Sequence, residues 1–219
     1  MARRTKEDAE VTRSRLLDAA ELVFHAKGVG GASLLDVAQA ASLTRGAIYW
    51  HFKDKADLFA AMMQRATLPF EQAWDAEHEN ASGRSALQGL LGVMQMVLRA
   101  ISTDESTRRV FDIALYKVEC VGEMLAVRER RLAGIKRFIW QMESELVLAA
   151  KQAGVTLPVS AASAARGLHA VFDGVLHAWL LQDAMPFDLE KEGMTAVAVY
   201  LRGLGLDPEK EIAQNFQNY

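Results

Sequence analysis

Residues 44–55, Thr-Arg-Gly-Ala-Ile-Tyr-Trp-His-Phe-Lys-Asp-Lys, decide how the N-terminal part of this chain folds. Thr44 is a good N-cap, because its hydroxyl can accept a hydrogen bond from an unpaired backbone N–H at a helix start. A short helix is therefore expected over residues 45–51. Ile48 and Phe52 are four positions apart and share one face, so they can anchor this helix to a core. A helix this short is not stable alone, so it must pack against neighbouring helices.

The preceding sequence supplies one such neighbour. A second short helix is predicted over residues 34–41, with Ser33 as its N-cap and Asp36 near its third position, a variant of the capping box. Residues 41–43 form the turn that joins the two helices. Two short helices joined by a three- or four-residue turn are the helix-turn-helix pattern.

The second of these helices carries groups that suit a nucleic-acid duplex. Arg45 is always charged and can reach a guanine edge or a phosphate, while Gly46 lets a partner's backbone approach closely. Tyr49 and His51 can donate hydrogen bonds to phosphates, and Lys55 lies in the first turn of the following helix. The alternative, an ordinary surface helix, is disfavoured by this run of Arg, Tyr, His and Lys around a glycine. The predicted DNA-binding residues are Ser33, Thr44, Arg45, Gly46, Ala47, Tyr49, His51 and Lys55.

These segments resemble the TetR family of transcriptional regulators, and within it the AcrR-type repressors of multidrug efflux pumps. The resemblance rests on residues 44–52, on the opening residues 1–6, on residues 117–124 and on residues 173–181. It is strong over residues 1–66 and continues diffusely to about residue 205. It implies an N-terminal DNA-binding domain, a C-terminal helical domain that holds a ligand pocket, and a homodimer.

Composition and charge are consistent with that interpretation. The chain has 219 residues, of which 51% are hydrophobic, with only four prolines, which favours an ordered all-α fold. Its net charge is −3, but residues 1–66 carry ten Lys and Arg against eight Asp and Glu. A mildly basic head on an acidic body suits a protein that uses one end on DNA. The basic arm formed by Arg3, Arg4 and Lys6 either enters an adjacent groove or is disordered.

The cellular compartment is predicted from the expected absence of a signal peptide, a membrane-spanning segment and an intrachain disulfide. No apolar segment follows the N-terminal basic residues, so no signal peptide is expected. No stretch is expected to reach the length of a membrane-spanning helix. Cys120, the single cysteine, cannot form an intrachain disulfide and is interpreted as a small buried residue rather than a redox sensor. A cytoplasmic protein without a membrane partner is predicted.

Periodicity predicts helices throughout the rest of the chain. The first runs from residue 7 to 27 and ends at Gly28. The fourth starts after Asp54, its predicted N-cap, and Pro69 should end or kink it near residue 68. Breaks are predicted at residues 80–83, near Gly122, at residues 154–158 and around Pro186, with a frayed tail after Pro208. The later helices are expected over residues 85–101, 103–118, 123–153, 160–182 and 189–204.

The predicted organisation is therefore all-α. Residues 1–54 form a three-helix helix-turn-helix DNA-binding domain, and residues 55–219 form a ligand-binding and dimerisation domain, with the helix that begins at residue 55 as connector. The last two helices are unusually apolar. They either close the core or pack against their copies in a second subunit, and the resemblance implies the dimer.

The ligand site is predicted less directly. The resemblance implies a pocket for a small hydrophobic or aromatic effector inside the helical body, and Met and aromatic side chains suit an adaptable apolar pocket, although most must serve the core. Asp173 and His177 are four apart on one helix face, where a local structural pair is the main alternative to a ligand contact. The candidate ligand-binding residues are Thr67, Phe111, Leu115, Trp140, Phe172, Asp173 and His177.

Enzymatic and metal-binding roles find no support. No His or Cys cluster has zinc spacing, so no metal or cofactor is predicted. Glu119 and Glu123 lie across the predicted helix break at Gly122, and no nucleophile or phosphate-binding glycine motif accompanies them. The predicted function is a homodimeric repressor of a multidrug efflux operon that binds a palindromic operator and is released by hydrophobic compounds. The alternatives are a repressor of a catabolic or lipid gene cluster, a helical ligand-binding protein that no longer binds DNA and, last, an enzyme.

Overall fold

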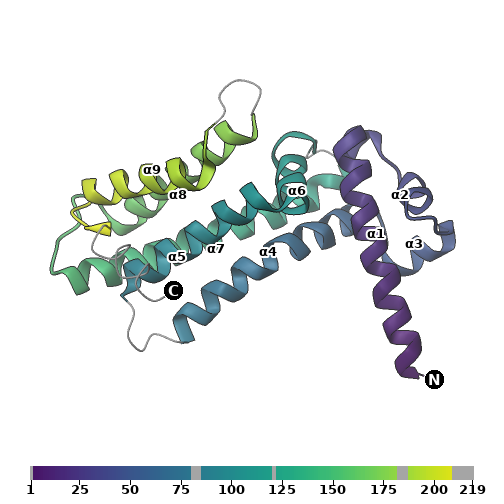
Figure 1. The fold of residues 1–219 in the computed structure, drawn as a ribbon, viewed down its shortest axis with the longest axis horizontal. Helices are drawn as coiled ribbons and strands as arrows, with labels where there is room; N and C mark the ends of the chain where they lie inside the picture. Colours follow the sequence, from purple (N-terminus) through teal and green to yellow (C-terminus); the bar gives the residue numbers. More distant parts are fainter. Residues whose placement is uncertain (1, 80–84, 120–121, 182–186, 209–219) are drawn as a thin grey trace. The chain divides into compact units, whose positions relative to one another are not determined.

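A computed structural model describes residues 2–79, 85–119, 122–181 and 187–208 (Figure 1). Within these residues every regular element is helical, which confirms the predicted all-α fold. The elements are α1 (Ala2–Gly31), α2 (Leu34–Ala40), α3 (Arg45–His51), α4 (Lys55–Glu79), α5 (Ala86–Thr103), α6 (Glu105–Tyr116), the 3₁₀ turn η1 (Gly122–Met124), α7 (Leu125–Ala153), α8 (Ala161–Leu180) and α9 (Leu189–Gly203).

The chain divides into two compact units. Unit 1 comprises residues 1–68 and 104–131, and unit 2 comprises residues 69–103 and 132–219. Helices α4 and α7 therefore contribute to both units. The functional division at residue 54 remains a prediction, because compactness does not test which residues bind DNA or ligand.

Unit 1 is organised around the apolar faces of α1 to α4. Phe24, Ile48 and Phe52 are almost completely buried in one continuous hydrophobic cluster. The same cluster contains Val110 and Ile113 from α6, and α6 packs along α1. Burial of such side chains contributes about 1.5–3 kcal/mol each. The hydrophobic cluster of α1 to α4 is thus completed by α6 residues that lie more than fifty positions after Phe52 in the sequence.

A buried carboxylate joins three helices of unit 1. Glu21 of α1 is 4% exposed, and its carboxylate accepts a hydrogen bond from the guanidinium of Arg65 on α4. It also accepts one from the hydroxyl of Ser106 on α6, at 2.6 Å. Arg65 makes a second ion pair with Asp18, at 2.7 Å. A buried carboxylate is tolerable only when it is paired in this way, so this cluster fixes α4 and α6 against α1.

Cationic side chains also complete helix ends in unit 1. The guanidinium of Arg15 donates to the carbonyl oxygen of Ala41, at the end of α2, over 2.7 Å. That of Arg131 donates to the carbonyl oxygen of Ala114, near the end of α6, over 2.6 Å. Terminal helix carbonyls lack intrahelical partners and carry partial negative charge, so both contacts stabilise helices that are too short to persist alone.

Unit 2 is built around the packing of α9 on α8 and on α5. Two glycines permit the close approach: a Cβ at Gly167 of α8 would lie 2.0 Å from the Tyr200 hydroxyl, and one at Gly193 of α9 would lie 2.6 Å from a Leu98 methyl. The Tyr200 hydroxyl donates to the carbonyl oxygen of Ala164, at 3.0 Å. Burial of that hydroxyl raises the pKa of Tyr200.

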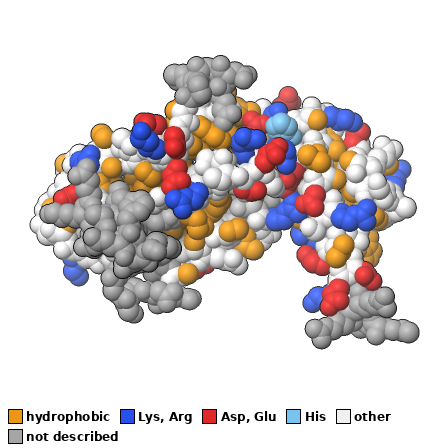
Figure 2. All heavy atoms as spheres, viewed as in Figure 1, with side chains coloured by type: hydrophobic (Ala, Val, Ile, Leu, Met, Phe, Trp, Pro, Cys, Tyr) orange, Lys and Arg blue, Asp and Glu red, His pale blue; other side chains and the backbone are white. Residues whose placement is uncertain are grey.

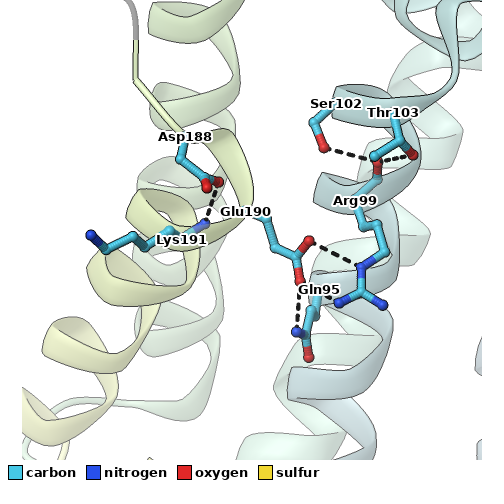
Figure 3. A network of polar contacts seen from close by, with 7 residues as sticks. All are labelled: Gln95, Arg99, Ser102, Thr103, Asp188, Glu190 and Lys191. Carbon is cyan, nitrogen blue, oxygen red and sulfur yellow. Dashed lines mark hydrogen bonds and ion pairs between the residues drawn. The ribbon is translucent and has the colours of Figure 1, made fainter.

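The α5–α9 contact is reinforced by polar groups (Figure 3). The Glu190 carboxylate accepts hydrogen bonds from the Arg99 guanidinium, at 2.8 and 3.0 Å, and from the Gln95 amide, at 2.8 Å. The Arg99 side chain, followed by the Gln95 amide, lowers the pKa of Glu190 despite the opposing effect of burial. Asp188 caps α9 through the backbone N–H of Lys191.

Several predicted helix boundaries agree with the structure and three do not. Helix α1 begins at Ala2, before the start predicted at residue 7. Asp54 and Ser160 accept hydrogen bonds at the starts of α4 and α8, as predicted. Gly28 has φ 71° and interrupts helical geometry, but helical hydrogen bonding resumes to Gly31. Pro69 was predicted to end or kink α4 near residue 68, and it does not end the helix, which continues to Glu79. Burial of Trp74, beyond the proline, favours this continuation.

The expectation about membrane-spanning length was also wrong. Helix α5 has 18 residues and a mean hydropathy of 1.2, enough in length and composition to cross a bilayer. More than half of that segment is buried within the fold, where its apolar residues face neighbouring helices. Core helices and spanning helices share this composition, and packing distinguishes them.

Some predictions concern positions outside the described residues. These are the break at residues 80–83, Cys120, the loop around Pro186 and the tail beyond residue 208.

Candidate nucleic-acid interface

Helices α2 and α3 form the predicted helix-turn-helix, and their caps are those that the sequence predicted. The Ser33 hydroxyl accepts from the Asp36 backbone N–H at 3.1 Å, and Asp36 in turn accepts from the Ser33 backbone N–H, which completes a capping box. The Thr44 hydroxyl accepts from the Ala47 N–H at 3.2 Å. Ser42, in the turn, has φ 54°, the left-handed conformation that costs a non-glycine residue about 1 kcal/mol.

Asp36 is held by a further contact. The Lys27 ammonium of α1 lies 2.5 Å from its carboxylate, and this contact, together with the Ser33 hydrogen bonds, lowers the pKa of Asp36 well below its usual range. Ser33 is therefore engaged in fixing α2. Its predicted contact with DNA remains a prediction.

Helix α3 has one anchored face and one exposed face. Ile48 and Phe52 are 0% and 2% exposed, as their spacing predicted. On the other face Tyr49 is 50% exposed and Trp50 is 73% exposed. Large apolar side chains that project into solvent from a short, rigidly held helix are typical of an interaction surface. Trp50 was absent from the predicted contacts, although its position beside Tyr49 in the motif could have indicated it.

Arg45 lies at the first position of α3. Its guanidinium carbon is 5.5 Å from the centre of the Tyr49 ring, a cation–π arrangement. Next to it, Gly46 has ample open space, with only the Thr44 hydroxyl within 4 Å of an added Cβ, and Ala47 is half-buried. The first turn therefore presents a cation and an uncluttered backbone.

His51 and Phe52 end the helix beside a cation from α1. The Arg13 guanidinium carbon is 5.4 Å from the centre of the Phe52 ring. Burial, followed by the charge of Arg13, lowers the pKa of His51, which favours the neutral imidazole. The ring of His51 also meets that of Trp50 edge-on, with centroids 4.5 Å apart. Sequence reasoning missed Arg13, because only the folded chain brings α1 to this end of α3.

Lys55 has a different environment from the one expected. Its ammonium group donates to the carbonyl oxygens of Ala32, at 3.1 Å, and Gly30, at 3.4 Å. It therefore ties the start of α4 to the α1–α2 connection. If Lys55 contacts a phosphate, its ammonium group must do so while it also donates to these two carbonyl oxygens.

Charge on this unit is mixed. On the face shown in Figure 2, Lys and Arg side chains alternate with Asp and Glu over the helices of unit 1. This agrees with the modest positive balance of residues 1–66. That face therefore presents mixed charge and not a continuous basic patch.

The predicted ligand-binding residues are distributed over both units. Thr67 on α4 and Phe111 and Leu115 on α6 are half-buried in unit 1. Trp140, in unit 2, is 65% exposed on α7. On α8 the His177 imidazole Nε2 lies 3.4 Å from a carboxylate oxygen of Asp173, which agrees with a local structural pair.

Phe172, another candidate, lies within an aromatic cluster. Its ring centroid is 6.2 Å from that of Phe138, which also lies 5.9 Å from Trp74 and 6.0 Å from His169. Burial lowers the pKa of His169 and favours the uncharged ring. These rings, from α4, α7 and α8, pack against one another, and side chains of this kind also line sites for flat apolar molecules. Phe138 and His169 were not predicted, since their proximity depends on how three helices cross.

No group of three or more potential metal ligands occurs within the residues that the structure describes.

Comparison with known proteins supplies the family context. Residues 16–62 match the profile of bacterial regulatory proteins of the tetR family, and residues 85–206 match the C-terminal region of MAATS-type transcriptional repressors. The chain is 32% identical over 201 residues to the HTH-type transcriptional regulator AcrR of Shigella flexneri, covering 92% of this chain and 93% of that protein.

Two solved structures are also similar. The first is NalD, the secondary repressor of the MexAB-OprM multidrug efflux pump in Pseudomonas aeruginosa, with a TM-score of 0.80, 32% identity and coverage of 90% of this chain and 98% of that one. The second is the complex of SmeT, from Stenotrophomonas maltophilia, with triclosan. It has a TM-score of 0.76 and 34% identity, over 88% and 90% of the two chains.

Proposed function

Because this chain belongs to the TetR family of bacterial transcriptional repressors, we propose that it binds a palindromic operator as a homodimer and releases it when a small hydrophobic or aromatic compound binds. Members of this family are regulators and not enzymes. The observation that carries the proposal is the two-faced helix α3. Its buried Ile48 and Phe52 anchor it to the core, while Arg45, Tyr49 and Trp50 remain exposed to solvent.

The DNA contacts follow from the chemistry of α3. Arg45 would read a guanine in the major groove, and Gly46 and Ala47 would allow the backbones to approach. Tyr49, His51 and the Thr44 cap would contact phosphates and set the register. Arg13 of α1 adds a cation at the end of the same helix.

A homodimer fits both the DNA and the distribution of apolar residues. Two α3 helices about one helical turn apart would read two half-sites, so the operator would be palindromic. Helices α8 and α9 are the proposed dimer elements. Val199, on α9, is 60% exposed in the single chain, so it is available for burial against a second subunit.

The proposed effector site is the helical body, centred on the aromatic cluster of Phe138, Phe172, Trp74 and His169. A similar protein, SmeT, forms a complex with triclosan, a chlorinated aromatic compound. NalD represses a multidrug efflux pump. Control of an efflux operon in the cytoplasm is accordingly the proposed biological role.

A ligand would act by favouring one of two states of the dimer. It shifts the population away from DNA binding only if it binds the DNA-incompetent state more tightly. In the proposed division, residues 1–54 bind DNA, residues 55–219 bind ligand and dimerise, and α4 connects them.

Fluorescence anisotropy tests the proposal directly. The protein is titrated onto the intergenic DNA upstream of its own gene and onto random duplex, at two salt concentrations, with and without triclosan. We expect tight, selective binding that triclosan or a similar aromatic compound releases. Selective binding that such compounds leave unchanged would remove the efflux-type effector, and equal binding to both duplexes would contradict the operator proposal.

Arg45→Ala is expected to lower operator binding by about 1–3 kcal/mol, concentrated at one base pair, because one bidentate base contact is lost. Operator variants at each position, titrated with both proteins, locate that base pair. Equal losses on all sequences would instead make Arg45 a phosphate contact.

Lys55→Ala is expected to weaken binding to every sequence and to reduce the slope of log affinity against log salt by about one contact. The measurement is the anisotropy titration repeated across salt concentrations. Lys151→Ala, which removes an exposed cation near the end of α7, serves as the matched control. Weaker binding with an unchanged slope would assign Lys55 solely to holding the Gly30 and Ala32 carbonyls.

A further inference from the structure

The stacking of Arg45 on Tyr49 has a consequence for specificity. We infer that Tyr49 is a positioning residue. Its ring holds the Arg45 guanidinium in the orientation that contacts a base, and this role is separate from any contact of the Tyr49 hydroxyl with phosphate. The inference rests on the proposed function, since it concerns how the same site discriminates between sequences.

The geometry of α3 supports this role. Arg45 and Tyr49 are four residues apart, so they lie on one face of the helix. The guanidinium carbon is 5.5 Å from the ring centre, within the range of a cation–π interaction. Within the described residues no hydrogen bond or ion pair holds this guanidinium, whereas Arg15, Arg65 and Arg131 are all bonded to protein groups. The ring is thus the contact that limits where the Arg45 head group lies.

The helix itself would not place a cation there. Arg45 occupies the first turn of α3, where the positive end of the helix dipole disfavours a positive charge. A long, flexible side chain in that field would sample many rotamers, and ordering it on binding carries an entropic cost. Stacking on the electron-rich ring face opposes both effects. It restricts the guanidinium before DNA arrives, which is how preorganisation improves a contact.

The surroundings leave the ring available for this task. Tyr49 is half-exposed and is not needed to anchor α3, because the buried Ile48 and Phe52 hold the helix to the core. The neighbouring Trp50 ring packs edge-on against His51 and does not compete for the Tyr49 face. Two functions of Tyr49 can therefore be separated chemically, because phenylalanine retains the ring and lacks the hydroxyl, while leucine lacks both.

The test compares Tyr49→Phe and Tyr49→Leu, each with Arg45 intact and with Arg45→Ala. The readout is discrimination, the ratio of affinities for the operator and for the variant altered at the base pair that Arg45 reads. Tyr49→Leu is expected to lower this ratio about threefold to tenfold, and Tyr49→Phe to leave it unchanged. In the Arg45→Ala background Tyr49→Leu should have no further effect on the ratio.

A second readout needs no DNA. In the free protein, the Arg45 side-chain Nε–Hε resonance, assigned by its loss in Arg45→Ala, should show a ring-current shift that persists in Tyr49→Phe and disappears in Tyr49→Leu. Equal discrimination by the leucine and phenylalanine variants, or an additive effect of Tyr49→Leu on Arg45→Ala, would overturn the inference while operator binding stands. Failure of the unchanged protein to bind its operator selectively, with the ring-current shift present, would overturn the proposed function and this role with it.

Discussion

Replacing Glu21 with alanine is expected to lower the free energy of unfolding by about 2–3 kcal/mol, because it removes one member of a buried ion pair. The Glu21 side chain is 5% exposed and accepts from both Arg65 and Ser106. Its loss leaves a cation and a hydroxyl with incomplete partners between α1, α4 and α6. We expect a smaller loss of stability than for a fully buried ion pair, because the Arg65 side chain is one-third exposed and keeps its ion pair with Asp18.

The measurement is urea unfolding followed by circular dichroism, at fixed protein concentration because dimerisation would add to stability. Glu21→Gln, which keeps the shape and one acceptor, should have a smaller effect. Glu105→Ala is the matched control, since Glu105 forms an exposed i,i+4 pair with Arg109 and should contribute no more than about 0.5 kcal/mol. Equal effects of the Glu21 and Glu105 replacements would contradict the view that the buried cluster holds α6 to the head.

Replacing Gly167 with alanine is expected to lower the free energy of unfolding by about 1–3 kcal/mol, the usual consequence of overpacking a close contact. The new Cβ would lie 2.0 Å from the Tyr200 hydroxyl and 2.7 Å from the adjacent ring carbon. The ring cannot move aside without giving up its hydrogen bond to Ala164. Helices α8 and α9 must then separate, or Tyr200 must leave its site.

Thermal unfolding of a small set of variants separates the clash from the effect of helix propensity. Gly174→Ala, on the same helix with open space around it, should stabilise the protein by up to about 1 kcal/mol. In a Tyr200→Ala background, Gly167→Ala should become neutral or stabilising, because the clashing atoms are gone. A loss of similar size in that background would show that the close approach of Tyr200 is not the cause. Since α8 and α9 are the proposed dimer elements, the oligomeric state should be measured for each variant.

The all-α fold, the family and most helix boundaries could be predicted from the sequence. The starts of α2 and α3 are indicated by their capping residues Ser33, Asp36 and Thr44. The spacing of Ile48 and Phe52 identifies the buried face of α3. These features depend on residues within one or two helical turns of each other, so the amino-acid sequence specifies them directly. Pro69 did not end α4, because burial of Trp74 beyond the proline favours continuation of the helix.

The remaining features depend on contacts between distant segments. Arg13 beside Phe52, Glu21 between Arg65 and Ser106, and the aromatic rings around Phe138 are neighbours only after folding. Lys55 looked available for phosphate, yet the fold directs its ammonium to the carbonyls of residues 30 and 32.

The sequence by itself determined which helix is suited to reading DNA, because capping and helical periodicity are local properties. Only the tertiary structure decided which residues of other helices, such as Arg13, lie beside that helix. The physical reason is that burial, ion pairing and ring stacking act over a few ångströms in space, whatever the separation along the chain.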